Sequence, residues 1–149
     1  GLGKAAELAR LNMQDENTRV RALRDRLEAA LLRSCPDAQV NGDTARRLPN
    51  TTNISLEYVE GEAILLLLSD RGIAASSGSA CTSGSLEPSH VLRAMGVPFT
   101  YVHGSLRLSL SIYNTDEDID RVLEVLPKVV ARLREMSPLY KKGGRGGAQ

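Results

Sequence analysis

Apolar positions predict a long helical region at the start of the chain. From Leu2 to about Arg33 the residues suit a helix throughout. In the second half of this region, apolar residues recur at intervals of three and four, which places them on one helical face. They are Val20, Leu23, Leu27, Ala30 and Leu31. The pattern weakens between residues 12 and 18, so one long helix and two helices with a break both remain open. Pro36 ends the region.

A second apolar stripe predicts a helix near the other end of the chain. It runs from Ile119 to Leu133 at helical spacing. The preceding Thr115-Asp116-Glu117-Asp118 is typical of a helix start, because threonine caps the first turn and acidic residues favour the positive end of the helix dipole. We expect this helix to extend to about Met136. Residues 138–149 have little apolar content and are expected to form a flexible tail.

Short segments between these helices predict strands. Residues 38–40 form a brief strand closed by the turn sequence Asn41-Gly42-Asp43. Residues 52–58 alternate in polarity, the pattern of a strand with one buried face. Residues 105–110 place three leucines on one face and Arg107 on the other. Residues 73–75 are a further brief strand candidate.

The middle of the chain predicts two more helices. Residues 62–70 are too continuously apolar for an exposed helix and indicate a short buried one, ended at Gly72. A second helix is expected to start at 87–89, with Pro88 in its first turn, and to end at Gly96. Residues 97–104 are expected to be a connector. This order of elements predicts an α+β fold, a small three- to four-stranded, mostly antiparallel sheet with helices on one face.

Composition and charge exclude several classes of partner. The chain has 149 residues, enough for one domain, and a formal net charge of +1 with the two signs interleaved. This balance gives no electrostatic case for nucleic acid or a membrane as partner. The longest apolar run, residues 63–68, is too short to span a bilayer. No export signal is visible, so we expect a cytoplasmic protein. The sequence has no CxxC motif and no histidine cluster, so it predicts no metal site.

One of the two cysteines lies in a polar segment. Residues 76–86 read SSGSACTSGSL, which cannot bury much apolar surface and predicts an exposed, flexible loop around Cys81. Structural free cysteines usually lie among apolar residues, so Cys81 is either reactive or an incidental surface thiol. Cys35, between a helical stripe and Pro36, is interpreted as structural.

The segment GIAASSGSACTSGSLEPSHVLRAMG resembles the active-site segment of the class I cysteine desulfurases, most closely of the NifS type. RLPNTTNISLEYVEGEAILLLL before it and HGSLRLSLSIYNTDEDIDRV after it match the same family in order and spacing. The resemblance covers roughly residues 2–138. It implies the C-terminal small domain of a fold-type I pyridoxal-phosphate enzyme at 1–137, with a linking helix region at 1–33.

The resemblance also implies roles for individual residues. Cys81 corresponds to the nucleophile that attacks the sulfur of L-cysteine and carries it as a persulfide, leaving L-alanine. Arg107 corresponds to the arginine that binds the substrate carboxylate; without the family it would be interpreted as an edge-strand arginine in a salt bridge. His103 could assist proton transfer or orient the loop, or be a turn residue. Asn53 is interpreted as a strand-surface residue rather than a ligand.

The family binds pyridoxal 5'-phosphate through a lysine in a Ser-X-His-Lys context, which this sequence lacks. We therefore expect the cofactor in a full-length homodimeric enzyme, no cofactor-binding residue in this chain, and an inactive isolated fragment. The resemblance implies an iron–sulfur scaffold protein as sulfur acceptor and suggests nitrogen fixation, with a housekeeping role left open. The alternative function is a non-catalytic module that accepts sulfur or docks a partner.

Overall fold

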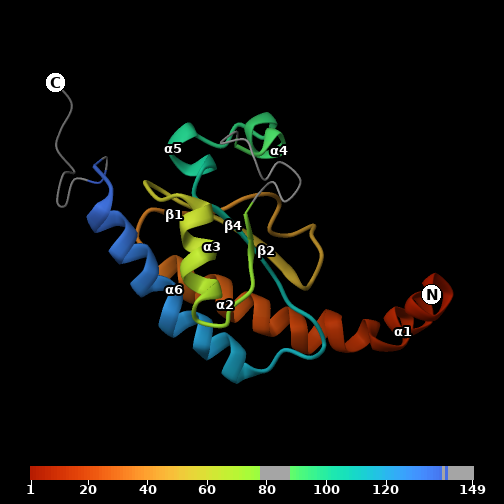
Figure 1. The fold of residues 1–149 in the computed structure, drawn as a ribbon. Coiled ribbons are helices and arrows are strands. Elements are labelled where there is room, and N and C mark those ends of the chain that lie inside the picture. Colours follow the sequence, from red (N-terminus) through yellow and green to blue (C-terminus); the bar gives the residue numbers. More distant parts are fainter. Residues whose placement is uncertain (78–87, 139, 141–149) are drawn as a thin grey trace.

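The computed structural model describes residues 1–77, 88–138 and 140. Its first three elements form one helical rod, α1 (Leu2–Asp15), the π-helical turn η1 (Glu16–Val20) and α2 (Arg21–Ser34). The residues that join these elements keep right-handed helical dihedral angles. The weak apolar pattern around residues 12–18 therefore marks a change of helical pitch at and just before η1, and the chain does not break there. Figure 1 shows α1 projecting away from the rest of the molecule.

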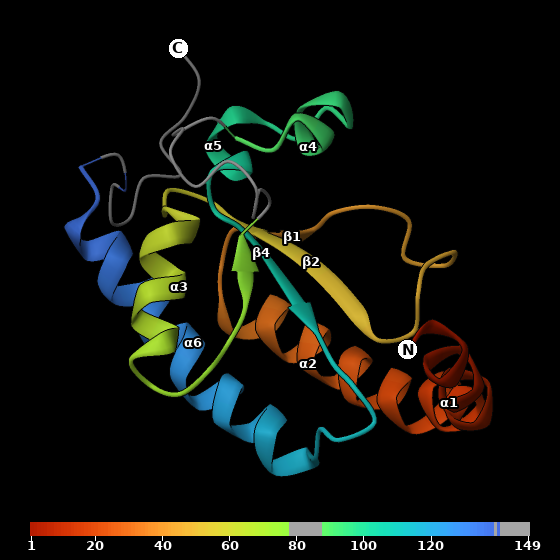
Figure 2. The same cartoon turned by 45° about the vertical axis from the view of Figure 1, so that its right-hand side comes forward.

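A four-stranded antiparallel sheet forms the centre of the fold. Its strands are β1 (Ala38–Val40), β2 (Thr51–Leu56), β3 (Ser76–Ser77) and β4 (Ser105–Ser109), in the order β1-β2-β4-β3. Figure 2 shows β2 and β4 side by side, with α2, α3 and α6 gathered along the sheet. The sequence prediction of an α+β fold with a small antiparallel sheet is confirmed.

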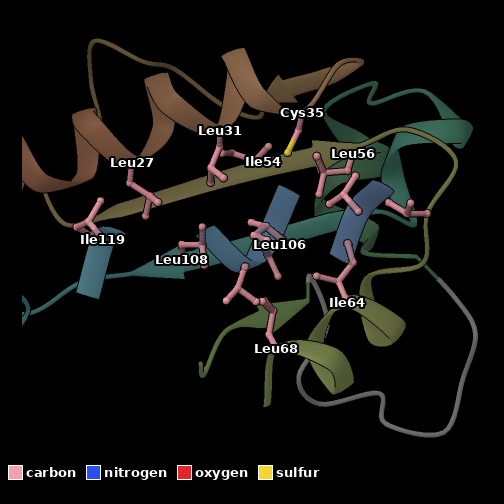
Figure 3. Packing of buried hydrophobic residues seen from close by; sticks show 14 of the residues in the cluster. Leu27, Leu31, Cys35, Ile54, Leu56, Ile64, Leu68, Leu106, Leu108 and Ile119 are labelled. Carbon is pink, nitrogen blue, oxygen red and sulfur yellow. The ribbon is translucent and has the colours of Figure 1, made fainter. Parts of the chain in front are cut away.

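Three helices cover one face of the sheet. They are α2, α3 (Gly61–Ser69) and α6 (Asp116–Met136), and their apolar side chains join those of β2 and β4 in one core. Figure 3 shows the leucines of α2 on one side of β2, with Leu106, Leu108, Ile64 and Leu68 completing the packing. Thr115 caps α6, and its hydroxyl and the Asp118 carboxylate form the expected capping box.

Two sequence predictions about the strands and connectors are wrong. Residues 73–75 are not a strand, because the N–H of Ile73 donates to the Leu68 carbonyl at 3.0 Å and closes the end of α3. The strand β3 begins directly after this segment, at Ser76. Residues 97–104 are not a plain connector, since they contain the single-turn helix α5 (Phe99–Val102), whose first hydrogen bonds go to the carbonyl of Pro98.

The start of the helix around residue 90 also differs from the prediction. The helix α4 (His90–Ala94) begins after Pro88, because Ser89 is its cap and its hydroxyl accepts from the N–H of Leu92. Pro88 thus precedes the cap and is not in the first turn. Over the described ranges, no helix combines the length and the apolar content needed to cross a membrane.

Candidate functional site

The strand β4 places Arg107 on the face of the sheet opposite the core. Leu106 and Leu108 are buried in the core, while Arg107 between them is exposed. This follows from the alternation of side chains along a strand. The strand lies inside the sheet, between β2 and β3. Arg107 is therefore not an edge-strand residue.

Polar residues from the other strands lie in a row with Arg107. Asn53 of β2 and Ser76 of β3 are its direct partners in register. The N–H of Asn41, just after β1, donates to the Asn53 carbonyl at 2.9 Å, which puts Asn41 at the far end of the row. We name these four residues the polar row. Among the described residues Arg107 has neither an ion-pair partner nor a hydrogen-bond partner for its side chain.

A side-chain network orders one end of the polar row. The amide nitrogen Nδ2 of Asn41 donates to Oδ1 of Asn53 at 2.6 Å and to Oγ of Ser55 at 2.8 Å. Ser55 is fully buried, and Asn41 and Asn53 are half-buried. Sequence reasoning treated Asn41 only as part of a turn. Its distance of twelve residues from Asn53 gives no signal of contact until the hairpin register is known.

Cys81 lies outside the described residues. The last described residues before it form β3, which pairs Ser76 with Arg107 and Ser77 with Leu106. On this side of the gap the described residues therefore end beside the polar row.

His103 lies in a different environment from Arg107. Its ring packs edge-on against Phe99, with the ring centroids 4.7 Å apart. It lines a cavity of about 340 Å³ together with side chains of α3 and α6, such as Ala63 and Leu133. These helices pack on the core side of the sheet. No described contact joins His103 to Arg107, and its ring nitrogen Nε2 is buried without a hydrogen-bond partner in the described residues.

Cys35 is buried at the end of α2 with 2% of its surface exposed. Burial raises the pKa of the Cys35 thiol, although Ser34 and Arg134 act in the opposite direction. A thiol that is buried and protonated is a poor nucleophile. This environment matches the interpretation of Cys35 as a structural residue.

The described lysines do not fit a pyridoxal-phosphate site. Lys4 pairs with Glu7 on α1 at 3.0 Å, and Lys128 pairs with Glu124 on α6 at 3.2 Å. Both side chains are well exposed on helical surfaces, whereas a lysine that forms a Schiff base is activated by burial or by nearby charge. Within the described ranges, no three His, Cys, Asp or Glu residues gather as a metal site would require.

Comparison with known proteins identifies the family of this chain. Residues 1–122 match the aminotransferase class-V family model, and the chain belongs to this family. A cysteine desulfurase of Gluconacetobacter diazotrophicus is 66% identical over 140 residues, which is 94% of this chain and 35% of that protein. The cysteine desulfurase NifS of Azotobacter vinelandii is 62% identical over 144 residues, 97% of this chain and 36% of that protein.

Within the family, the resemblance to cysteine desulfurases of the NifS type is confirmed. The crystal structure of a NifS-like protein from Rickettsia africae superposes with a TM-score of 0.74 at 30% identity, over 87% of this chain and 33% of that one. The chain thus spans about a third of the length of the relatives that it matches. The family implies dependence on pyridoxal phosphate in the full-length enzyme.

Proposed function

We propose that this chain is the C-terminal part of a cysteine desulfurase and contributes two residues to its active site. Arg107 binds the carboxylate of L-cysteine, and Cys81 removes and carries its sulfur. The observation that carries the proposal is the exposed guanidinium of Arg107, without a side-chain partner among the described residues, in a row of polar groups on the face away from the core helices. A guanidinium binds a carboxylate through two parallel hydrogen bonds.

The attachment of the Cys81 segment supports the second role. Ser76 of β3 pairs with Arg107 and precedes Cys81 by five residues in the sequence, so we propose that the thiol acts at the carboxylate site. In the proposed step an S–S bond forms between Sγ of Cys81 and the sulfur of cysteine, while the C–S bond of cysteine breaks. The electron pair of that bond stays with carbon, and a proton completes L-alanine. A tethered persulfide can then reach an acceptor away from the site.

The remaining parts of the activity belong to other residues and other proteins. We propose that pyridoxal phosphate is held outside this chain, in a full-length homodimer, and that the isolated chain does not turn over cysteine. His103 is proposed only as an auxiliary residue that orients the Cys81 segment. The sulfur acceptor is proposed to be an iron–sulfur scaffold protein in the cytoplasm, with nitrogenase assembly as the process that the NifS relative suggests.

A chimera tests this function. The chain replaces the matching third of Azotobacter vinelandii NifS, and alanine, sulfide and protein-bound persulfide are measured with L-cysteine as substrate. We expect the chimera to be active, Cys81→Ser to form no persulfide, and Arg107→Lys to raise KM by about tenfold or more, because lysine keeps the charge but loses the two parallel bonds.

Matched variants control for general damage. Cys35→Ala removes the buried thiol, and Arg132→Lys makes the same change on the exposed surface of α6; both should keep persulfide formation and KM. A folded chimera that contains pyridoxal phosphate but releases no alanine would contradict the proposal. Uptake of sulfur from a donor without alanine release would instead indicate the non-catalytic module.

A further inference from the structure

The pairing of β2 with β4 brings the side chains of Asn53 and Arg107 close together. The N–H of Asn41 donates to the Asn53 carbonyl, so the backbone polar groups of Asn53 point toward β1. In an antiparallel strand, both groups of a residue point to the same side. Asn53 and Arg107 therefore form a non-hydrogen-bonded pair, in which the Cα atoms are about 4.5 Å apart and the side chains are closest.

Asn41 determines which end of the Asn53 amide remains available. Its Nδ2 donates to Oδ1 of Asn53 at 2.6 Å, so the acceptor of Asn53 is already engaged. The other end, Nδ2, carries two donors, and the structure gives them no partner among the described residues. With this orientation Asn53 presents donors beside the five donors of Arg107. The opposite orientation would turn Oδ1 toward Arg107 and give the guanidinium a partner.

A site with donors only is suited to a carboxylate, whose oxygens accept hydrogen bonds and carry a negative charge. We propose that Asn53 is a second ligand of the substrate carboxylate: its Nδ2 donates to one oxygen while Arg107 binds both. Asn41 is a positioning residue, which acts by holding Oδ1 of Asn53. This proposal rests on the proposed function for the role of Arg107, and extends it to a neutral donor that was interpreted from the sequence as a strand-surface residue.

Nuclear magnetic resonance of the chain tests the site directly, without turnover. L-alanine and ethylamine share the amine and the methyl group and differ by the carboxylate, so they are matched probes. We expect the Arg107 Nε–H and Asn53 Nδ2–H₂ signals to shift with L-alanine along curves that give one dissociation constant. Ethylamine should leave both signals in place.

Variants separate the two residues. Asn53→Ala should weaken L-alanine binding about tenfold, the typical effect of losing a hydrogen bond to a charged group. Asn53→Asp should weaken it further, because its carboxylate pairs with Arg107 and repels the ligand. Asn41→Ala should also weaken binding although Asn41 does not contact the ligand, because Oδ1 of Asn53 is then free to turn toward Arg107.

A charge control in β4 and kinetics of the chimera complete the test. Ser109→Asp adds the same charge on the same face of β4, two residues from Arg107, and should have a smaller effect than Asn53→Asp. In the chimera, Asn53→Ala should raise KM with little change in kcat. If Arg107 shifts while Asn53 does not, and Asn53→Ala binds normally, the inference is wrong and the proposed function stands. If L-alanine shifts neither signal and Arg107→Lys leaves the KM of the chimera unchanged, the carboxylate role of Arg107 fails as well.

Discussion

At the scale of single residues, a largely buried ion pair joins α2 to the segment between β1 and β2. Glu28 of α2 accepts from both terminal nitrogens of Arg47, at 2.6 and 2.7 Å, and from the hydroxyl of Thr52 in β2. Glu28 and Thr52 are buried. The pair fixes the segment between β1 and β2 against α2, and with it the start of the strand that carries Asn53.

The pH dependence of stability should report this pair. Burial alone would raise the pKa of Glu28, but hydrogen bonds from Arg47 and Thr52 outweigh it, so the pKa lies below its ordinary value of 4.5. A lowered pKa in the folded state means that Glu28 stabilises the fold above pH 4.5, and that this contribution disappears as the pH falls through the lower, folded pKa. Glu28→Gln should therefore lower the free energy of unfolding by about 3 kcal/mol at pH 7, because the partly buried Arg47 loses its charged partner.

Urea unfolding at pH 7 and near pH 3 measures this difference. The difference in the free energy of unfolding between Glu28→Gln and the parent chain should be smaller at the lower pH. Glu124→Gln is the matched control, since Glu124 forms an exposed ion pair with Lys128, and it should change stability by less than about 0.5 kcal/mol. An equal loss at both pH values would mean that Glu28 acts through packing rather than charge.

At the scale of elements, the helices with strong apolar periodicity and the strands with clear alternation were predicted within a few residues. The errors fall where a tertiary contact decides the structure. The strand at β3 depends on pairing with β4 and not on the apolar residues 73–75, and α5 is a single turn that no periodicity can reveal. The site follows the same pattern. Arg107 was found from the family resemblance, whereas the role of Asn41 depends on a hairpin register that the sequence does not specify.

The close approach of β2 and β4 depends on one glycine. A Cβ at Gly104 would lie 2.0 Å from the Leu56 carbonyl oxygen and 2.9 Å from that of Val59. Both atoms belong to the backbone, one at the end of β2 and one shortly after it, so neither can move aside without a shift of the main chain. Gly104→Ala should therefore lower the free energy of unfolding by more than about 3 kcal/mol or prevent folding.

Two other glycines serve as comparisons, because a Cβ would have more space at each of them than at Gly104. A Cβ at Gly61 would lie 3.0 Å from the Ser105 carbonyl oxygen, while one at Gly3 would meet nothing within 4 Å. Thermal and urea unfolding should show a moderate loss of stability for Gly61→Ala. Gly3→Ala should lose no stability, since alanine is a better helix former than glycine. A Gly104→Ala variant as stable as Gly3→Ala would contradict the packing of β4 against the end of β2.

At the scale of the whole molecule, the stability of the chain comes from the sheet and the helices packed on it, which we call the body, and not from the projecting helix α1. No residue of α1 is buried, and its Leu2 and Leu11 are 87% and 61% exposed. By contrast, α2 buries Leu23, Leu27 and Leu31 in the core. A helix of 14 residues without tertiary packing is marginal in water. We therefore expect α1 to open independently of the rest, with little hydrogen-exchange protection.

Deletion of residues 1–11 tests this distribution. The shortened chain should lose helical circular dichroism in proportion to the residues removed, yet keep the unfolding midpoint of the full chain within about 2 °C, because less than about 0.5 kcal/mol of packing is lost. Measurements at two protein concentrations provide the control. If the deletion lowers the midpoint, and the midpoint of the full chain rises with concentration, then α1 packs against a second copy of the chain. In that case the exposed leucines of α1 form an interface, and the body does not account for the stability alone.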